Sequence, residues 1–469
     1  MRYTSNKIVE LYDRSPIWSR SFASTAYGFL KDRKEKTKLF WQCLAELEET
    51  QWWSLEKLQD LQSQRLKKLI KHCAENVPYY QKKFAEYGII PSQIQTPDDL
   101  KKIPILDKET IRKNFDDFIS KDVNPQKLRL QSTGGTTGKP LKVLMNEEVY
   151  FYQKAIQALH RSWGNFKYGK DWLGVLAGYK VVPVSRKKPP FWIINHYGKQ
   201  IHFSSYHLSY DFLSSYVKKI KETKVKYLMG YASAIGFLAN YVISTDEYIP
   251  LESVFLSSEP ILDWQRKAIK KAFSCNIFDY YGQAECVISA INCDQSISLH
   301  QNMEVGLMEF EKINQNDNNC KIIGTSLVNY AFPLIRYDIG DVTSSIIYKC
   351  DCGREHIKIQ PIETRVEDFI ITPDGSTIPP PALTLPYHGI KGIISSQIIQ
   401  NRVDTLLVKI VNNNQFTIQE KEKFIKNFKD CVGKNMKINI MEVKEIPRTA
   451  NGKFRFVISE LKDSQSKNI

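Results

Sequence analysis

The sequence of 469 residues lacks any long hydrophobic run. No apolar segment approaches the roughly 20 residues that a membrane-spanning helix needs. The opening MRYTSNKIVELYDRSPIWSR has no continuous apolar stretch of the kind found in a secretory signal. Cysteine is sparse as well: nine residues, an odd number, are scattered along the chain, which is typical of reduced thiols. We therefore expect a cytoplasmic protein without a transmembrane segment.

Internal repeats, low-complexity tracts and nucleic-acid-binding motifs are absent too. No zinc-finger, RRM-like or helix-turn-helix pattern accompanies the net charge of +15. The lysines mix with glutamates, as in KDRKEKTK at 31–38, which is typical of solvated helix faces. The sequence therefore predicts no nucleic-acid partner. The positive charge leaves open an attraction to an anionic substrate, or peripheral contact with an anionic membrane.

What is present indicates a large globular chain of at least two domains, with 42% hydrophobic and 25% charged residues. Residues 1–115 read as a mostly helical lead-in. Apolar strands then alternate with helices up to about 345, which predicts a layered α/β domain. The predicted strands are 171–178, 225–231, 252–258 and 275–282, and the predicted helices are 208–222, 232–243 and 262–273.

The pattern of the sequence changes after about residue 364, where a proline-rich segment, PPPALTLPYHG, precedes a small α+β unit. Its predicted elements are strands at 405–411 and 436–443 and a helix at 417–430. The expected division is therefore a large domain over 1–364 and a small, mobile C-terminal domain over 365–469.

A Gly-rich segment, LRLQSTGGTTGKPLKVL at 128–144, joins two apolar runs. It departs from the P-loop pattern G-x-x-x-x-G-K-[ST] at two positions. The pattern requires glycine where the chain has Thr133, and serine or threonine where it has Pro140. Proline also biases Lys139 away from the α region, so we expect the loop to join two extended segments. Glycines and hydroxyls can wrap phosphate, although an ordinary hairpin loop fits the same residues. The candidate phosphate-binding residues are Ser132, Thr133, Gly134, Gly135, Thr136, Thr137, Gly138 and Lys139.

Two further segments end predicted strands, where ligands gather in open α/β sheets. SSEP, 257–260, is the first, and FDYYGQAE, 278–285, is the second. The rings of Tyr280 and Tyr281 can stack on a base, and Gly282 allows close backbone approach. A carboxylate at Glu285 can hold magnesium on phosphate.

Two more segments complete the set. FPLIRYDIGD, 332–341, contains Asp341, whose carboxylate can accept two hydrogen bonds from ribose hydroxyls. EIPRTANGKFRF, 445–456, contains a lysine that follows a glycine near the C-terminus. Each segment alone is most often a turn, but their order and spacing together are informative.

That order resembles the adenylate-forming superfamily of acyl-CoA synthetases and adenylation domains. STGGTTGKP is similar to its phosphate loop, YYGQAE to its aromatic-Gly-x-x-Glu motif and RYDIGD to its ribose motif. ETRVEDFIITPDG is similar to its hinge and PRTANGK to its C-terminal lysine motif. The resemblance spans about 130–456. Within the superfamily, the chain most resembles the phenylacetate–CoA ligase branch, on the basis of NVPYYQKKFAEYGII and CDCGR. The segment DRSPIWSRSFASTAYGFL is similar to the capsular-polysaccharide members of that branch.

The resemblance implies ATP-dependent activation of a small carboxylic acid as an acyl-adenylate, followed by thioester formation with coenzyme A. It implies catalytic roles for Lys453, Glu285 and Arg365, a Mg²⁺ ion near Glu285, and a hinge at Glu367. The residues implied to bind ATP or AMP, besides the phosphate loop, are Ser258, Glu259, Pro260, Asp279, Tyr280, Tyr281, Gly282 and Asp341.

The chain departs from the family pattern at three places. Thr364 replaces a glycine before the hinge arginine, Glu367 replaces an aspartate, and Ala232-Ser233 replaces Pro-Ser. None removes an essential charge, but the last leaves the selectivity of the acyl pocket open. Two alternatives also stay open: an enzyme that passes its acyl group to a carrier protein or a sugar, and a catalytically silent nucleotide-binding protein.

A separate set of residues suggests a metal. Cys293 and His300 flank DQSISL, and Cys350 and Cys352 form a Cys-x-Cys after the ribose motif. Three thiolates and one imidazole can hold structural zinc in a tetrahedron, and similar positions recur in the phenylacetate–CoA ligase branch. Four unrelated residues in a reducing cytosol are the alternative. Five other cysteines are assigned to the core or to no role: Cys43, Cys73, Cys275, Cys286 and Cys431.

Overall fold

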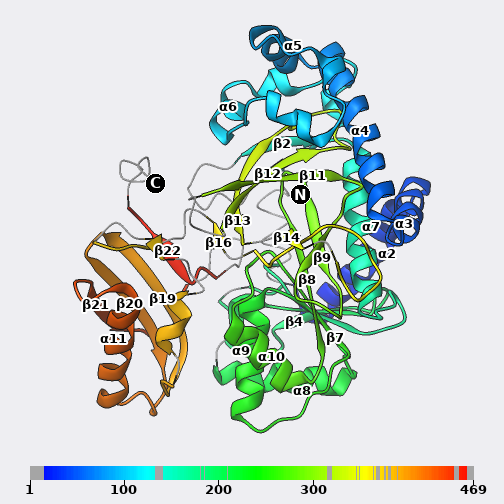
Figure 1. Cartoon of the computed structure of the whole chain (residues 1–469). Helices are drawn as coiled ribbons and strands as arrows, with labels where there is room; N and C mark the ends of the chain where they lie inside the picture. Colours follow the sequence, from blue (N-terminus) through cyan, green and yellow to red (C-terminus); the bar gives the residue numbers. More distant parts are fainter. Residues whose placement is uncertain are drawn as a thin grey trace. The chain divides into compact units, whose positions relative to one another are not determined.

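The chain divides into two compact units, and Figure 1 shows its helices and strands. Unit 1 comprises residues up to 29, 167–277 and those from 363 on; unit 2 comprises 30–166 and 278–362. The computed structural model describes residues 15–132, 141–179, 181–183, 185–208, 210–313, 319–344, 346–347, 349–362, 364–365, 370–373, 377–378, 382–387, 389–447 and 454–461.

The N-terminal part of unit 2 is helical, as predicted. Its longest helix, α4 (Leu55–Asn76), begins at Ser54, whose side chain accepts a hydrogen bond from the backbone N–H of Lys57. Leu58, Leu66 and Leu69 fall on one face and are fully buried. The other helices of this part are α3 (Lys38–Thr50), α5 (Pro78–Glu86) and α6 (Lys108–Lys113).

In unit 2, the two segments that flank the Gly-rich loop are extended, as predicted, and they pair with each other. β1 (Arg129–Ser132) pairs antiparallel with β2 (Lys142–Met145), and Ser132 lies opposite Lys142. The loop thus runs from one extended segment into another, as the proline predicts. Helix α7 (Glu147–Trp163) follows directly, with Asn146 accepting from the N–H of Val149 at its start.

Two further sheets form the rest of unit 2. In one, the strand order is β14-β15-β10-β9-β8, with antiparallel pairing. In the other, β11, β12 and β13 form an antiparallel meander. Their bounds are β8 (Asn276–Gly282, beginning in unit 1), β9 (Ser289–Asn292), β10 (Leu299–Gln301), β11 (Gly306–Lys312), β12 (Cys320–Ser326), β13 (Tyr337–Thr343), β14 (Ile346–Ile347) and β15 (Lys358–Ile359).

Unit 1 contains a parallel sheet in the order β7-β6-β3-β5, with β4 antiparallel at its edge. Close pairing of β6 and β3 requires glycine at 230, because a Cβ there would lie 2.2 Å from the carbonyl oxygen of Leu176. The elements that match predicted ones are β3 (Leu173–Leu176), α8 (Tyr210–Thr223), β6 (Tyr227–Gly230), α9 (Ala232–Ser244), β7 (Ser253–Ser257) and α10 (Asp263–Phe273). Strands β4 (Trp192–Asn195) and β5 (Gln200–Phe203) were not predicted.

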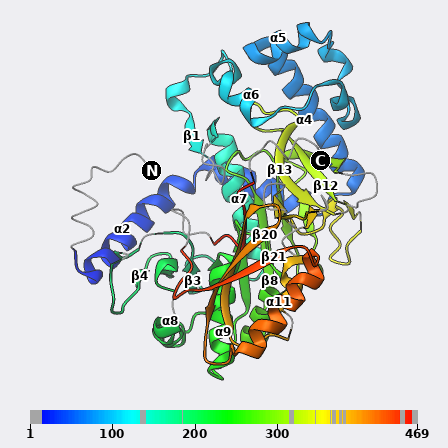
Figure 2. The same ribbon diagram turned by 90° about the vertical axis from the view of Figure 1, so that its left-hand side faces the viewer.

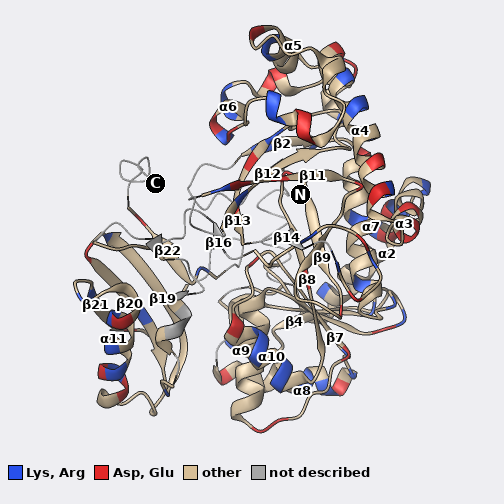
Figure 3. Cartoon of the chain, viewed as in Figure 1, with Lys and Arg blue, Asp and Glu red and all other residues tan. Residues whose placement is uncertain are grey.

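The C-terminal part of unit 1 is a four-stranded sheet, β21-β20-β19-β22, covered by α11 (Ile418–Val432). Phe424 and Phe428 of α11 are fully buried in one core with Val408 and other strand residues. Lysines and glutamates interleave along the outer surface of α11 (Figure 3), as expected for a solvated helix. The strands are β19 (Ile393–Arg402), β20 (Thr405–Asn412), β21 (Lys437–Glu442) and β22 (Val457–Ser459). The predicted α/β class with a small α+β part is confirmed.

Candidate nucleotide site and Cys/His cluster

Two carboxylates of unit 2 are each held by a tyrosine hydroxyl. Tyr281 donates to Asp341 Oδ2 at 2.9 Å, across 60 residues of sequence. Tyr337 donates to Glu285 Oε1 at 2.7 Å, across 52 residues. Both carboxylates are nearly buried, with 5% and 6% of Asp341 and Glu285 exposed. The structure therefore brings together the predicted ribose aspartate and the predicted magnesium ligand, each with a fixed orientation.

Tyr337 and Asp341 both belong to β13. The strand is irregular between them, with a register shift against β12 and a φ of +81° at Gly340, so the faces do not simply alternate there. Burial, followed by the charge of Glu285, raises the pKa of Tyr337 well above its usual range. That hydroxyl is therefore a proton donor at any physiological pH, and the Glu285 oxygen that it contacts accepts.

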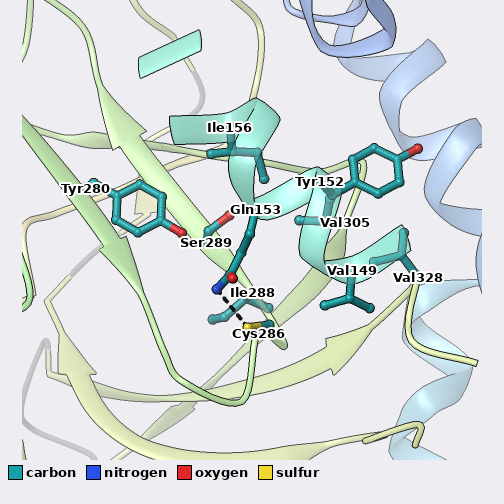
Figure 4. A pocket seen from close by; sticks show the side chains of 10 residues that line it. All are labelled: Val149, Tyr152, Gln153, Ile156, Tyr280, Cys286, Ile288, Ser289, Val305 and Val328. Carbon is teal, nitrogen blue, oxygen red and sulfur yellow. Dashed lines mark hydrogen bonds between the residues drawn. The ribbon is translucent and has the colours of Figure 1, made fainter. Parts of the chain in front are cut away.

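Tyr280 and Tyr281 are successive residues of β8 and therefore project to opposite faces. Tyr281 lies with Asp341, whereas Tyr280 lines a pocket against α7 (Figure 4). A Cβ at Gly282 would lie 2.8 Å from the Tyr280 hydroxyl oxygen, so glycine is what leaves room for that ring. The same pocket is lined by Val149, Tyr152, Gln153, Ile156, Cys286, Ile288, Ser289, Val305 and Val328.

The SSEP segment follows β7 at the carboxyl edge of the parallel sheet of unit 1. Ser258 there has a φ of +70°, a left-handed conformation that turns the chain sharply. Glu259 accepts from the backbone N–H of Ser233, at the start of α9, at 3.0 Å. Its other oxygen accepts from the N–H of Phe454 at 2.9 Å. In unit 1, SSEP therefore lies beside both the Ala232-Ser233 segment and the residue that follows Lys453.

Several predicted site residues fall outside the described residues. These are Thr133, Gly134, Gly135, Thr136, Thr137, Gly138, Lys139, Glu367 and Lys453. Ser132 is the last residue of β1, Asp279 is buried within β8, and Pro260 follows Glu259 after β7. Arg365 lies in the short strand β16 (Thr364–Arg365).

Cys293, His300, Cys350 and Cys352 form one cluster in unit 2, and their ligand atoms lie within 4.8 Å of one another. Cys293 Sγ is 3.6 Å from Cys350 Sγ, and Cys352 Sγ is 3.5 Å from His300 Nε2. A tetrahedral zinc ion spaces two thiolate sulfurs about 3.8 Å apart and a sulfur and an imidazole nitrogen about 3.5 Å apart. The four residues therefore fit zinc in both donor type and spacing.

Sheet pairing explains how the cluster is assembled. His300 lies in β10, between β9 and β15. Cys293 follows β9, and the Cys-x-Cys lies in the connection from β14 to β15. Burial, and then the charge of His356, lowers the pKa of His300 to about 3. The imidazole is therefore neutral, as a metal ligand must be. None of the nine cysteines forms a disulfide in the structure.

Two contacts of this region were missed by the sequence analysis. Tyr337 belongs to RYDIGD, but its contact with Glu285 had no local signal, because the two residues are 52 positions apart in the sequence. The contact between Glu259 and the N–H of Ser233 had no local signal, since it depends on how β6 and β7 align.

The chain is similar in sequence to known proteins over most of its length. Residues 370–460 match the family model of the CapK C-terminal domain. The chain is 28% identical to Protein CapK of Staphylococcus aureus, over 96% of this chain and 99% of that one. It is 23% identical to a phenylacetate-coenzyme A ligase of Thermus thermophilus, over 86% of this chain and 96% of that one.

Among solved structures, 2-hydroxyisobutyryl-CoA ligase in the postadenylation state, in complex with 2-HIB-AMP, has the same fold. The TM-score is 0.67 at 18% identity, and the match covers 89% of this chain and 92% of that one. In the part of the chain that the structure describes, no helix is both long and apolar enough to span a bilayer. The resemblance inferred from the motifs is confirmed: the chain is similar to CapK and to the phenylacetate-coenzyme A ligases over most of its length, and it has the fold of an acyl-CoA ligase.

Proposed function

We propose that this protein is an ATP-dependent, AMP-forming acid–thiol ligase that activates a small carboxylic acid. The observation that carries the proposal is the convergence of the Tyr281–Asp341 and Tyr337–Glu285 pairs in unit 2. One pair offers a fixed carboxylate for ribose hydroxyls, and the other offers a fixed carboxylate for a metal ion on phosphate. Such pre-oriented groups need no reorganisation when the nucleotide binds.

In the proposed reaction, the substrate carboxylate attacks the α-phosphorus of ATP, and pyrophosphate leaves. Two anions must approach, so the site needs N–H donors and positive charge. We assign these to the 132–139 loop, Arg365 and Lys453, with Glu285 holding the magnesium. Bound Mg²⁺ would neutralise charge on the phosphate oxygens. The thiol of coenzyme A then attacks the carbonyl carbon of the adenylate and releases AMP.

We place this chemistry in the cytoplasmic biosynthesis of a capsule or another surface polysaccharide. Support comes from the 28% identity to Protein CapK across nearly the whole chain and from the CapK C-terminal domain at 370–460. Support for coenzyme A as the acceptor comes from the likeness to phenylacetate-coenzyme A ligase. We further propose that the Cys/His cluster holds one structural zinc ion, supported by its sulfur and nitrogen spacings.

A panel of carboxylic acids, assayed for pyrophosphate release with and without coenzyme A, tests this function. We expect ATP-dependent release with at least one acid, and formation of its thioester only when coenzyme A is present. Pyrophosphate release that is indifferent to coenzyme A, with no thioester formed, would favour a carrier protein or a sugar as the acceptor. Formation of ADP and phosphate instead of AMP and pyrophosphate would contradict the proposal.

A further inference from the structure

Helix α2 (Ile17–Glu35) presents large apolar side chains to solvent. Trp18 is 76% exposed, Phe22 is 75% exposed and Leu30 is 57% exposed. At about 100° per residue, these three side chains and Ala26 fall within one arc of the helix. The pattern is not that of a surface helix of a globular protein, whose apolar stripe faces the core.

The side of α2 that faces the protein is largely small and polar. Ser21 Oγ accepts from the N–H of Ile194 at 3.1 Å, and Thr25 Oγ1 accepts from the N–H of His196 at 3.0 Å. Gly28 lies against the Asn195 side chain, which a Cβ would approach to 2.5 Å. These contacts cover the edge strand β4, alongside which α2 runs (Figure 2), and satisfy its backbone donors. The hydroxyl-bearing face of α2 therefore contacts β4, and the aromatic face points to solvent.

The basic and acidic residues at the end of α2 also lie on different parts of the helix surface. Arg33 and Lys34 fall on the exposed arc, beyond Leu30. Both carboxylates fall outside that arc: Asp32 pairs with Lys36 at 3.0 Å, and Glu35 pairs with Lys154 at 3.5 Å. The exposed arc thus combines aromatic rings with cations and carries no carboxylate of the helix. Its complement must be both apolar and negatively charged, and a second copy of this arc would offer only cations.

We propose that α2 is a membrane-surface anchor that lies in the plane of the headgroups and binds anionic phospholipid bilayers. Tryptophan and phenylalanine suit the boundary between headgroups and acyl chains, and basic residues attract anionic lipid. With one short apolar face, we expect half-maximal binding at roughly 0.1–1 mM lipid, the range of a single acyl chain. The anchor would hold the enzyme at a bilayer reversibly, and it does not depend on the proposed activity.

Vesicle flotation of the full chain tests this proposal. We expect binding to phosphatidylcholine vesicles that contain about one-third phosphatidylglycerol, little binding to phosphatidylcholine alone, and a decrease with added salt. The double variant Trp18→Ser with Phe22→Ser should bind at least about 30-fold more weakly, because two exposed aromatic side chains no longer enter the bilayer. Lys34→Gln should weaken binding about fivefold.

Matched controls separate this effect from a general loss of surface hydrophobicity or charge. Ile418→Ser with Tyr248→Ser removes two side chains that are 74% and 69% exposed elsewhere, and should leave flotation unchanged. Lys67→Gln is the control for charge, on α4. All variants should keep the wild-type melting temperature, since every changed side chain is exposed.

Three results would overturn the proposal. The wild type could fail to float with anionic vesicles, or the aromatic double variant could float as well as its control. Light scattering could also show a dimer that the double variant dissociates, without lipid binding, and this face would then belong to a second copy of the chain.

Discussion

The candidate nucleotide-binding carboxylates Asp341 and Glu285 and the Cys/His cluster are all in unit 2, but their polar atoms are satisfied differently. Tyrosine hydroxyls donate to the two carboxylates, so each side chain is oriented without a ligand. In the cluster, sulfur lies against sulfur at 3.6 Å and against imidazole nitrogen at 3.5 Å. A neutral thiol is a weak donor and a weak acceptor, so such contacts contribute little by themselves.

The difference indicates two kinds of site. Carboxylates that are already held by the protein can bind and release a substrate with no loss of structure. Four ligands at metal spacing reach their stable arrangement only with the ion present, and the energy of binding then becomes energy of folding. We therefore expect perturbation of the nucleotide site to change affinity and rate, and perturbation of the cluster to change stability.

The largest expected effect is on the cluster. Chelation, or Cys350→Ser with Cys352→Ser, should remove about one equivalent of zinc. Loss of a structural metal belongs to the mutations that cost more than about 4 kcal/mol, which corresponds to a fall in melting temperature of roughly 10 °C. Elemental analysis and calorimetry measure both quantities, and Cys275→Ser, a half-buried thiol outside the cluster, is the matched control. Freshly purified, reduced protein without bound metal would contradict the zinc assignment.

The next effect concerns Lys453. From the resemblance, we propose that closure of the C-terminal domain delivers this lysine and that its ammonium group contacts charge only in the adenylation step. Lys453→Ala should slow adenylation by roughly 100-fold, the scale of losing one pre-oriented donor. Conversion of a supplied acyl-adenylate to acyl-CoA should be nearly unchanged.

Both half-reactions are measured on the same preparation, with Lys444→Ala as the control at an exposed lysine of the same segment. Equal loss in the two steps would make Lys453 a structural residue. An unaffected first step would move the catalytic lysine elsewhere, with Lys139 next.

The smallest effect concerns the orienting hydroxyl. Tyr281→Phe keeps the ring but removes the donor to Asp341, and should weaken AMP binding by about 1 kcal/mol, the worth of one hydrogen bond. Chelation of zinc from wild-type protein, measured well below its melting temperature, should leave AMP affinity unchanged. If removal of zinc changed the AMP affinity, the cluster and the candidate nucleotide site would be coupled, which would contradict the separation of the two sites made above.

Local patterns in the sequence predicted most of the elements. The apolar runs at 225–231 and 252–258 contain β6 and β7. Pro140 predicted that the chain is extended after the Gly-rich loop, and strand β2 follows there. The contact from Tyr337 to Glu285 was not predicted, because it depends on how β13 lies against a turn 52 residues away. Periodicity alone would also bury the wrong side of α2, since its aromatic arc faces outward and its hydroxyls cover β4.

Calorimetric titration of AMP into wild type and Asp341→Ala tests the central claim most directly, because it needs no knowledge of the acid substrate. The account predicts that the variant loses at least about 1.5 kcal/mol of binding free energy, the scale of a hydrogen bond to a charged group. Glu311→Gln, a partly exposed carboxylate on β11, should bind AMP as the wild type does. Unchanged affinity in Asp341→Ala would contradict the assignment of the ribose site and of the reaction built on it.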